Sequence, residues 1–382
     1  MGIYKKVTYL RHMTTIYKNA RVFTGDTVLD KAHVTVENDK ISSVQTTEPD
    51  TTGAQVIDLQ GKSLAPAFID LQIYGGKGKL FNNEPTVETI RKTYETVQEG
   101  GAFAFQITLS CSPPETMWQA IDACRAYWAE GGKGLIGLHL EGPYFNPDKR
   151  GAHPLRHIRQ PHYEEVAALI DRGKGVVSYM TVAPEQFDDA TLDLLLKSDI
   201  HISAGHSNAS FAQAIHGFGR GILRVTHLFN AMSAFQSRAP GLVGATYDYT
   251  PWASIIADGV HVDYNALKIT KKVLGKKLFL ITDAVTESPM GDYHFLFAGD
   301  HYVDVNGTLA GSSLSMWQAV KNVVQHAGID LDEALRMAST YPAMVIDQGH
   351  RWGKIAAGYE AAMVVFSGER LVFSGECLVV SG

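Results

Sequence analysis

The stretch "GLIGLHLEGPYF" (134–145) is an apolar run that ends abruptly in a glutamate, Glu141, followed by Gly142 and Pro143. Leu and Ile residues on both sides of such a run are typical of a strand that is buried on both faces. An ionised carboxylate at the end of a buried strand is costly unless a partner compensates its charge. The stretch therefore predicts a buried parallel strand, with a compensated and functional charge at its carboxyl end.

Seven further apolar runs resemble this one, and most of them are followed by a pattern with an apolar spacing near 3.6, as in a helix. Strand and helix thus alternate eight times between residues 66 and 352, which predicts an α/β fold, a (β/α)8 TIM barrel. A doubly wound open sheet is the alternative, but no GxGxxG motif follows the first strand. The eight expected strands are 68–74, 103–109, 135–141, 176–185, 200–206, 224–229, 254–261 and 278–284.

The two ends of the chain have a different sequence pattern. They contain short segments in which apolar and polar residues alternate, and Gly- or Asp-bearing turns separate these segments. Chain termini often lie close together, so we expect residues 14–65 and 353–382 to form one small β-sandwich domain beside the barrel. Met13 opens a more typical N-terminus than Met1 does, and residues 1–12 are expected to be a disordered extension.

Composition narrows the class of protein. The net charge of −6 gives no basic face for nucleic acid, and no apolar run reaches the ~20 residues of a membrane span. The three cysteines form no CxxC pair, which favours a reducing compartment. The basic N-terminus is followed by no apolar signal segment. We therefore expect a cytoplasmic protein whose partner is a small molecule.

The carboxyl ends of barrel strands are where TIM-barrel enzymes gather their chemistry. Glu141, His206 and His227 end three of the expected strands and can together bind one divalent metal, leaving a position open for water. Asp283 ends the last strand and suits acid–base work beside such a metal, although it could instead cap a turn. The other strand ends carry Gln72, Tyr74, Thr108, Ser110, Glu185, Asp258 and His261.

Each histidine, taken alone, could instead have a purely structural role. A lone histidine at a strand end is more often a hydrogen-bonded core residue than a ligand. The segment "GHSNAS" (205–210) could simply cap a helix, with Ser207 or Asn208 at the N-cap. However, Glu141, His206 and His227 all fall at the same end of the expected barrel, and their occurrence together favours a metal site.

Several longer motifs resemble the amidohydrolase superfamily and, within it, the enzymes that deacetylate N-acetylglucosamine 6-phosphate. The resemblance covers nearly the whole chain. It implies that Glu141, His206 and His227 are the metal ligands and that Asp283 is the catalytic base and acid. The motifs are "PAFIDLQIYGG" (66–76), "HLEGPYFNPDKRGAHP" (139–154), "AGHSNAS" (204–210), "THLFNAMS" (226–233), "RAPGLVGA" (238–245), "IADGVHVD" (256–263), "LITDAV" (280–285) and "GTLAGSSLSM" (307–316).

The resemblance also implies a set of substrate contacts. It makes His153 a catalytic contact near the amide that steadies the developing oxyanion, and Arg238 a phosphate ligand donated across a homodimer interface. A bidentate arginine suits a phosphate dianion, although Arg238 could also be a solvated surface charge. Leu309, Ala310 and Gly311 would form a loop that closes over the sugar, or else an ordinary turn. The remaining implied contacts are Ala152, Asn230, Ala231 and His261.

One motif departs from the family. Many amidohydrolases carry His-x-His at the end of the first strand and bind a second metal there, but this chain has Gln72, Ile73 and Tyr74. An amide and a phenol are poor ligands for a divalent metal. We therefore expect one metal ion per subunit, with zinc preferred and iron or another divalent ion as alternatives. The sequence does not explain Tyr74, which could touch the ligand or only pack against its neighbours.

The expected reaction is hydrolysis of N-acetylglucosamine 6-phosphate to glucosamine 6-phosphate and acetate, with Asp283 moving the protons. A rival interpretation keeps the metal and changes the substrate to a cyclic amide, or to an unphosphorylated or galacto-configured amino sugar. A third interpretation is a non-enzymatic sugar-phosphate sensor. The complete set of Glu141, His206, His227 and Asp283 argues against the sensor.

Overall fold

The computed structural model describes residues 14–289, 291–368 and 370–371. The expected extension (1–12) and the last part of the expected C-terminal segment (353–382) lie outside these residues. The chain divides into two compact units, with the divisions after Pro66 and after Gly349. One unit holds both ends of the described chain, and Ala67–Gly349 is the other.

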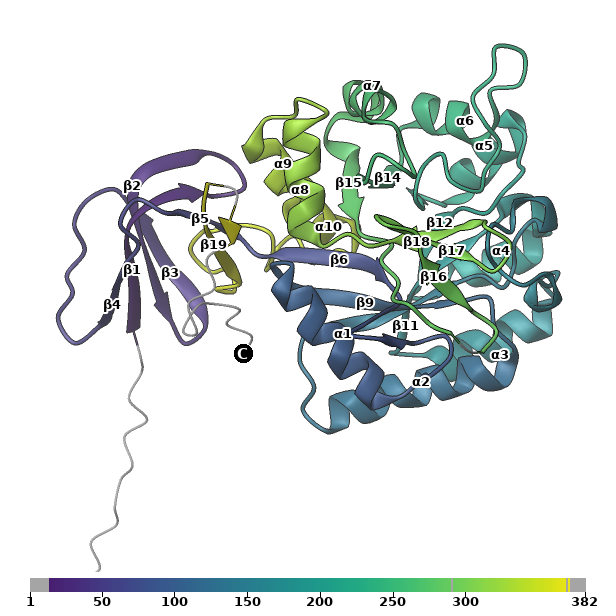
Figure 1. The fold of residues 1–382 in the computed structure, drawn as a ribbon, viewed down its shortest axis with the longest axis horizontal. Coiled ribbons are helices and arrows are strands. Elements are labelled where there is room, and N and C mark those ends of the chain that lie inside the picture. Colours follow the sequence, from purple (N-terminus) through teal and green to yellow (C-terminus); the bar gives the residue numbers. More distant parts are fainter. Residues whose placement is uncertain (1–13, 290, 369, 372–382) are drawn as a thin grey trace, which may run out of the picture. The chain divides into compact units, whose positions relative to one another are not determined.

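The larger unit is a barrel, as the sequence predicts (Figure 1). Every neighbouring pair of its strands is parallel. A bridge between Ile73 and Ala284 joins the last strand to the first, so the doubly wound open sheet is excluded. In their order around the sheet, the eight strands seen in the described chain are β6 (Phe68–Ile73), β9 (Ala102–Ser110), β10 (Leu135–Glu141), β11 (Val177–Val182), β12 (His201–Ala204), β13 (Arg224–Val225), β14 (Trp252–Ile256) and β15 (Leu278–Ile281).

The seam between β15 and β6 is closed by backbone and side-chain hydrogen bonds. The amide of Asp283 donates to the carbonyl of Gln72 over 3.0 Å. The buried carboxylate of Asp70 accepts from the Thr282 hydroxyl at 2.5 Å and from the Thr282 amide at 3.2 Å. These contacts fix the relative height of the two strand ends, from which Gln72, Tyr74 and Asp283 project.

Helices follow the barrel strands, and local signals explain where they begin. The side chain of Thr86 accepts from Thr89 at the start of α1, and Ser210 forms a capping box with Gln213 at the start of α5. The N-cap of α5 is thus Ser210 rather than Ser207 or Asn208. The helices are α1 (Val87–Glu99), α2 (Pro114–Ala129), α3 (Tyr163–Gly173), α4 (Asp189–Leu196), α5 (Phe211–Arg220), α6 (Gly241–Tyr249), α7 (Tyr264–Leu274), α8 (Met316–Gln325), α9 (Leu331–Ala338) and α10 (Thr340–Val345).

Two small antiparallel sheets lie in the loops after β6 and β15. One pairs β7 (Gly75–Gly76) with β8 (Lys79–Leu80). The other contains β16 (Phe295–Phe297), β17 (His301–Asp304) and β18 (Leu309–Ser312). The expectation of a loop at Leu309–Gly311 is therefore wrong. A tight turn at Asp304, whose carboxylate accepts from the Thr308 amide, returns the chain and lets it pair with β17.

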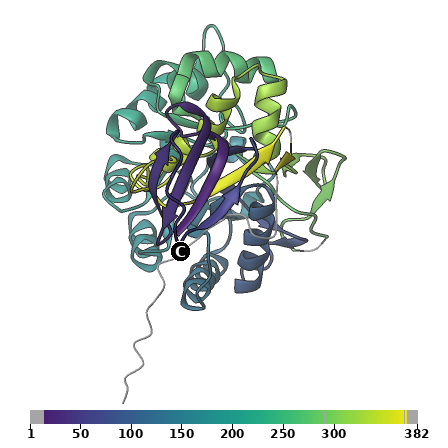
Figure 2. The same ribbon diagram turned by 90° about the vertical axis from the view of Figure 1, so that its left-hand side faces the viewer.

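The smaller unit is one sheet of seven described strands, in which residues from both ends of the chain lie side by side (Figure 2). Strand β1 pairs with β4 along its first half and with β5 along its second. Strand β19 then pairs with β5. The strands are β1 (Thr14–Phe23), β2 (Val28–Glu37), β3 (Lys40–Gln45), β4 (Gln55–Asp58), β5 (Ser63–Pro66), β19 (Met363–Ser367) and β20 (Arg370–Leu371).

This unit has its own apolar core, to which Val22, Val34, Leu64 and Met363 contribute fully buried side chains. Among the helices of the described chain, none combines the length and the apolar character that crossing a bilayer requires.

The barrel seam makes one prediction about stability. Replacing Thr282 with Val removes the hydroxyl that hydrogen-bonds to the buried carboxyl group of Asp70, and should cost about 1–3 kcal/mol, since a buried polar atom loses its partner. We expect a lower urea midpoint, followed by circular dichroism. Thr282→Ser keeps the hydroxyl and is the matched control. Equal midpoints for the Val and Ser variants would show that the hydrogen bond does not stabilise the seam.

Candidate metal centre and active site

A cavity of about 340 Å³ lies in the barrel unit, at the carboxyl ends of the strands. That volume suits a small organic ligand. Most of the expected site residues line it, although they come from separate strands and loops: Glu141, Ala152, His153, His206, His227, Asn230, Ala231, His261, Asp283, Leu309 and Ala310.

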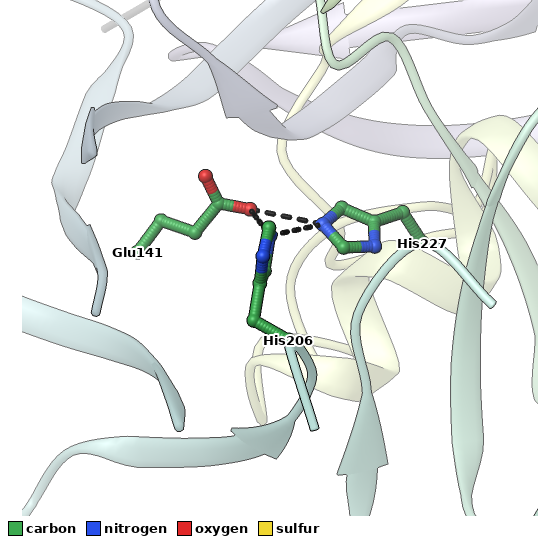
Figure 3. Close-up of side chains that lie close together, drawn as sticks. All are labelled: Glu141, His206 and His227. Atoms are coloured by element: carbon green, nitrogen blue, oxygen red, sulfur yellow. Dashed lines mark hydrogen bonds and ion pairs between the residues drawn. The ribbon is translucent and has the colours of Figure 1, made fainter. Parts of the chain in front are cut away.

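Glu141, His206 and His227 line this cavity and point toward one another (Figure 3). Glu141 Oε1 lies 3.3 Å from His206 Nε2 and 3.0 Å from His227 Nε2, and the two nitrogens are 3.1 Å apart. Ligands at 2.0–2.1 Å from a tetrahedral zinc are separated by about 3.3 Å. The three atoms therefore fit three corners of a tetrahedral cation site.

The described chain groups three metal-binding residues here, so a tetrahedral cation would take its fourth ligand from elsewhere, such as water. Supporting contacts orient His206. His206 Nδ1 lies 2.9 Å from the Lys149 carbonyl, so it donates its hydrogen there and leaves the Nε2 lone pair facing the centre. The ring of His206 also stacks on Phe145 at 4.1 Å.

The backbone at the site is strained. His206, His227 and Asp283 have φ values of 48°, 32° and 54°, in the left-handed region that non-glycine residues seldom adopt. Each such residue costs free energy, on the order of 1–3 kcal/mol, and such residues cluster at functional sites. The strain turns these side chains inward immediately after their strands.

Electrostatics prepare Glu141 and His206 for a cation. Burial alone would raise the pKa of Glu141, but the surrounding imidazoles outweigh it and hold that pKa well below its usual range. Burial lowers the pKa of His206 to about 4, which keeps its ring neutral. For His227, burial is outweighed by Glu141, and its pKa is raised. An ionised carboxylate and a neutral imidazole are both competent metal ligands.

Asp283 is buried next to the triad. Burial raises the pKa of Asp283 to about 6; nearby His227 opposes this shift and Glu141 adds to it. A carboxyl group whose pKa lies near neutrality can accept a proton in one step and return it in the next.

Gln72 and Tyr74 connect the two carboxylates. The Tyr74 hydroxyl donates to Glu141 Oε2 at 2.6 Å and lies 3.2 Å from Asp283 Oδ1. The Gln72 amide nitrogen lies 2.9 Å from Glu141 Oε1 and 2.7 Å from Asp283 Oδ1. Burial and the two carboxylates raise the pKa of Tyr74 well above its usual value, so its phenol stays protonated and donates.

His153 reaches the site from the loop after β10. Its Nδ1 accepts from the Cys111 amide at 3.2 Å, so a neutral ring carries its hydrogen on Nε2. That Nε2 lies 3.2 Å from Glu141 Oε2. His153 is thus a hydrogen-bond donor at the edge of the metal centre.

The other expected contacts have clear positions. His261 Nδ1 donates to Asp258 Oδ2 at 2.5 Å, which fixes the ring at the cavity wall. Asn230 and Ala231 line the cavity in the turn after His227, and the Asn230 amide donates to the His227 carbonyl at 3.3 Å.

Two expected contacts do not line the cavity. Arg238 is exposed in the loop before α6, and the structure records no hydrogen bond or ion pair from its guanidinium to any described residue. Gly311 lies behind the wall, where an added Cβ would come within 2.7 Å of Val285. Its φ of 157° and this close packing both suit glycine.

The sequence placed Glu185 at a strand end but gave it no role, and it did not single out Tyr293 or Phe295. Glu185 accepts from the Ser207 hydroxyl and the Asn208 amide, and so holds the loop that carries His206. Tyr293 and Phe295 form an apolar wall of the cavity. The alternation of aromatics in "DYHFLF" (292–297) was the available signal, but a local alternation does not say which cavity a strand will border.

Comparisons with known proteins agree with this geometry. Residues 63–377 match the Amidohydrolase family. An N-acetylglucosamine-6-phosphate deacetylase of Haemophilus influenzae is 36% identical over 91% of this chain and 94% of its own length. An N-acetylgalactosamine-6-phosphate deacetylase of Shewanella sp. is 35% identical over 80% and 79%.

A solved structure is also similar. The crystal structure of N-acetylglucosamine-6-phosphate deacetylase from Pasteurella multocida has a TM-score of 0.89 and 35% identity, covering 94% of this chain and 96% of that one. The family is metal-dependent, and the buried triad is where this chain fits a metal. The chain belongs to the amidohydrolase family.

Proposed function

We propose that this protein hydrolyses N-acetyl-D-glucosamine 6-phosphate to D-glucosamine 6-phosphate and acetate. The observation that carries the proposal is the position of Asp283, a buried carboxyl group beside a three-residue metal site in a ligand-sized cavity. Similarity to deacetylases over more than nine-tenths of the chain supports it.

The metal ligands in this proposal are Glu141, His206 and His227, and the preferred ion is a single zinc, with iron or another divalent ion as alternatives. A cation held there would polarise the acetamido carbonyl and make a water molecule more acidic. One carboxylate, two imidazole nitrogens and an open position suit zinc. The amide of Gln72 and the phenol of Tyr74, at the position of a second metal in relatives with His-x-His, favour one ion.

Asp283 accepts the proton of the attacking water and then gives it to the departing amine, because a carboxyl group with a pKa near 6 suits both steps. His153 carries its hydrogen on the nitrogen that faces the centre, and donates it to the oxyanion that forms on the carbonyl oxygen. Each role requires contact with the reacting amide, and both residues line the cavity.

Recognition of the sugar phosphate is assigned to the cavity walls. Leu309 and Ala310 of β18, with Ala152, cover the sugar, while Asn230, Ala231 and His261 bind polar groups. Gly311 lies behind the wall and supports it by packing against Val285. Arg238 is exposed and outside the cavity of its own subunit, which is compatible with donation to a phosphate in a partner subunit. The assembly in this proposal is a homodimer, and its compartment is the cytoplasm.

A galacto-configured substrate is the second candidate, because a relative named for N-acetylgalactosamine 6-phosphate is nearly as similar as the first one. Acetate release from the two 6-phosphates, measured side by side, separates the candidates. The higher kcat/KM identifies the preferred epimer.

The metal site predicts a dependence of stability on zinc. Added zinc should raise the melting temperature of the metal-stripped protein, since a ligand that binds the folded state stabilises it. His206→Asn should abolish this shift. His201→Asn changes a half-buried histidine at the start of β12, outside the cavity, and is the matched control. An equal zinc shift in both variants would exclude His206 as a ligand.

Asp283→Asn should lower kcat by at least about 10²-fold, because a proton acceptor is replaced by a neutral amide. Zinc content, measured by elemental analysis, should stay near that of the wild type. Asp263→Asn, at the exposed N-cap of α7, is the control and should leave kcat unchanged. Loss of zinc together with activity would make Asp283 a ligand instead.

Arg238→Ala should raise the KM for the phosphorylated substrate by about 10-fold or more, since a charge-assisted hydrogen bond is lost. Hydrolysis of unphosphorylated N-acetylglucosamine should not change. Arg91→Ala, which changes an exposed arginine of α1, is the control. If Arg238→Ala leaves both substrates unaffected, Arg238 is only a surface charge.

A further inference from the structure

The carboxylate of Glu185 accepts hydrogen bonds from two separate loops of the barrel rim. Glu185 lies in a short 3-10 helix (Pro184–Gln186) that follows β11, and it does not line the cavity. Its Oε2 accepts from the Ser207 hydroxyl at 2.7 Å. Its Oε1 accepts from the Asn208 amide at 2.6 Å and from the Asn146 side-chain amide at 3.0 Å. One carboxylate therefore joins the loop after β12 to the loop after β10.

The first of these connections holds the backbone that follows His206. Ser207 and Asn208 come directly after this histidine, whose φ of 48° lies in the left-handed region. A residue keeps such a strained conformation only when the surrounding structure holds it there. By accepting from both following residues, Glu185 restrains the chain on the carboxyl side of the strained position.

The second connection leads to the imidazole ring of His206. The side-chain oxygen of Asn146 accepts from the Asp148 amide at 3.0 Å and so caps the short helix Pro147–Lys149. The Lys149 carbonyl, at the end of this helix, accepts from His206 Nδ1 at 2.9 Å. The Asn146 amide also donates to the His206 carbonyl at 3.0 Å. The backbone and the ring of His206 are therefore both held by segments that meet at one carboxylate.

We propose that Glu185 is a positioning residue for the metal site, which holds the backbone and the ring of His206 in the orientation that the triad needs. The inference rests on the proposed function only for the role of His206 as a metal ligand, and it is independent of the substrate. A carboxylate suits this task because both of its oxygens accept, and here they meet three donors.

Glu185→Gln tests the proposal, because it replaces one accepting oxygen with an NH2 group that faces a donor. Zinc affinity, measured by chelator competition, should fall about 10-fold or more, as it does when a group that supports a metal ligand is lost. The absorption spectrum of the cobalt(II)-substituted protein should also change, since it reports the geometry of the ligands. Glu333→Gln is the matched control, because Glu333 is a half-buried carboxylate on α9 that accepts from Lys271, Arg336 and Tyr341 outside the cavity.

A double-mutant cycle tests the connection through the ring. Asn146→Ala should weaken zinc affinity more in the wild-type background than in the Glu185→Gln background, because the Asn146 side chain is held by Glu185. If Glu185→Gln does not fold, Asn146→Ala and Ser207→Ala each remove one of the two connections. Each should then bind zinc more weakly than the Glu333→Gln control.

The proposal is overturned if the folded Glu185→Gln protein matches the control in zinc affinity and keeps the cobalt spectrum of the wild type. A lower melting temperature of the metal-free protein without these two changes would make Glu185 a purely structural residue. A wild-type protein that binds zinc without releasing acetate would contradict the proposed function alone, since the zinc measurements still decide the role of Glu185.

Discussion

The buried charge of Glu141 is the constraint on which the rest of the site depends. The carboxylate closes a strand that is almost wholly apolar, and it is shielded from solvent. A charge in such a place persists only when partners stabilise it. The phenol of Tyr74, the amide of Gln72 and three imidazoles contact this one carboxylate. These partners come from separate strands and loops, which converge around Glu141 because its charge must be compensated.

Convergence depends on the closed barrel. Parallel strands place all their carboxyl ends at one rim, and closure makes that rim a ring. The seam between β15 and β6 completes the ring and puts Gln72 and Tyr74 opposite Glu141 and next to Asp283. The left-handed backbone of His206, His227 and Asp283 then turns their side chains into the centre, at a cost in conformational energy that the surrounding packing offsets.

The two carboxyl groups at the centre behave differently because their neighbours differ. Glu141 is surrounded by imidazoles and stays ionised, whereas burial dominates at Asp283 and raises its pKa to about 6. One group is therefore a suitable ligand and the other a suitable proton carrier. The division of labour arises from the surroundings of two chemically similar side chains.

Sequence patterns alone were enough to predict the eight strands. The first strand, β6, and the last, β15, begin at the expected residues, 68 and 278. Apolar runs and helical spacing report burial, which is local information. The polar strand ends Glu141, His206, His227 and Asp283 could be predicted for the same reason, since a polar residue ending an apolar run is visible in the sequence.

Other features depend on contacts between distant segments, and only the tertiary structure decided them. The pairing of Leu309–Ser312 as a strand depends on β17, and the hydrogen bonds of Tyr74 depend on partners 67 and 209 residues away. The aromatic wall of Tyr293 and Phe295 likewise borders the cavity only because the chain after β15 folds back over the rim. A linear sequence shows which side chains are available. The closed barrel decides which of them meet, because closure sets the distances between strand ends that are far apart along the chain.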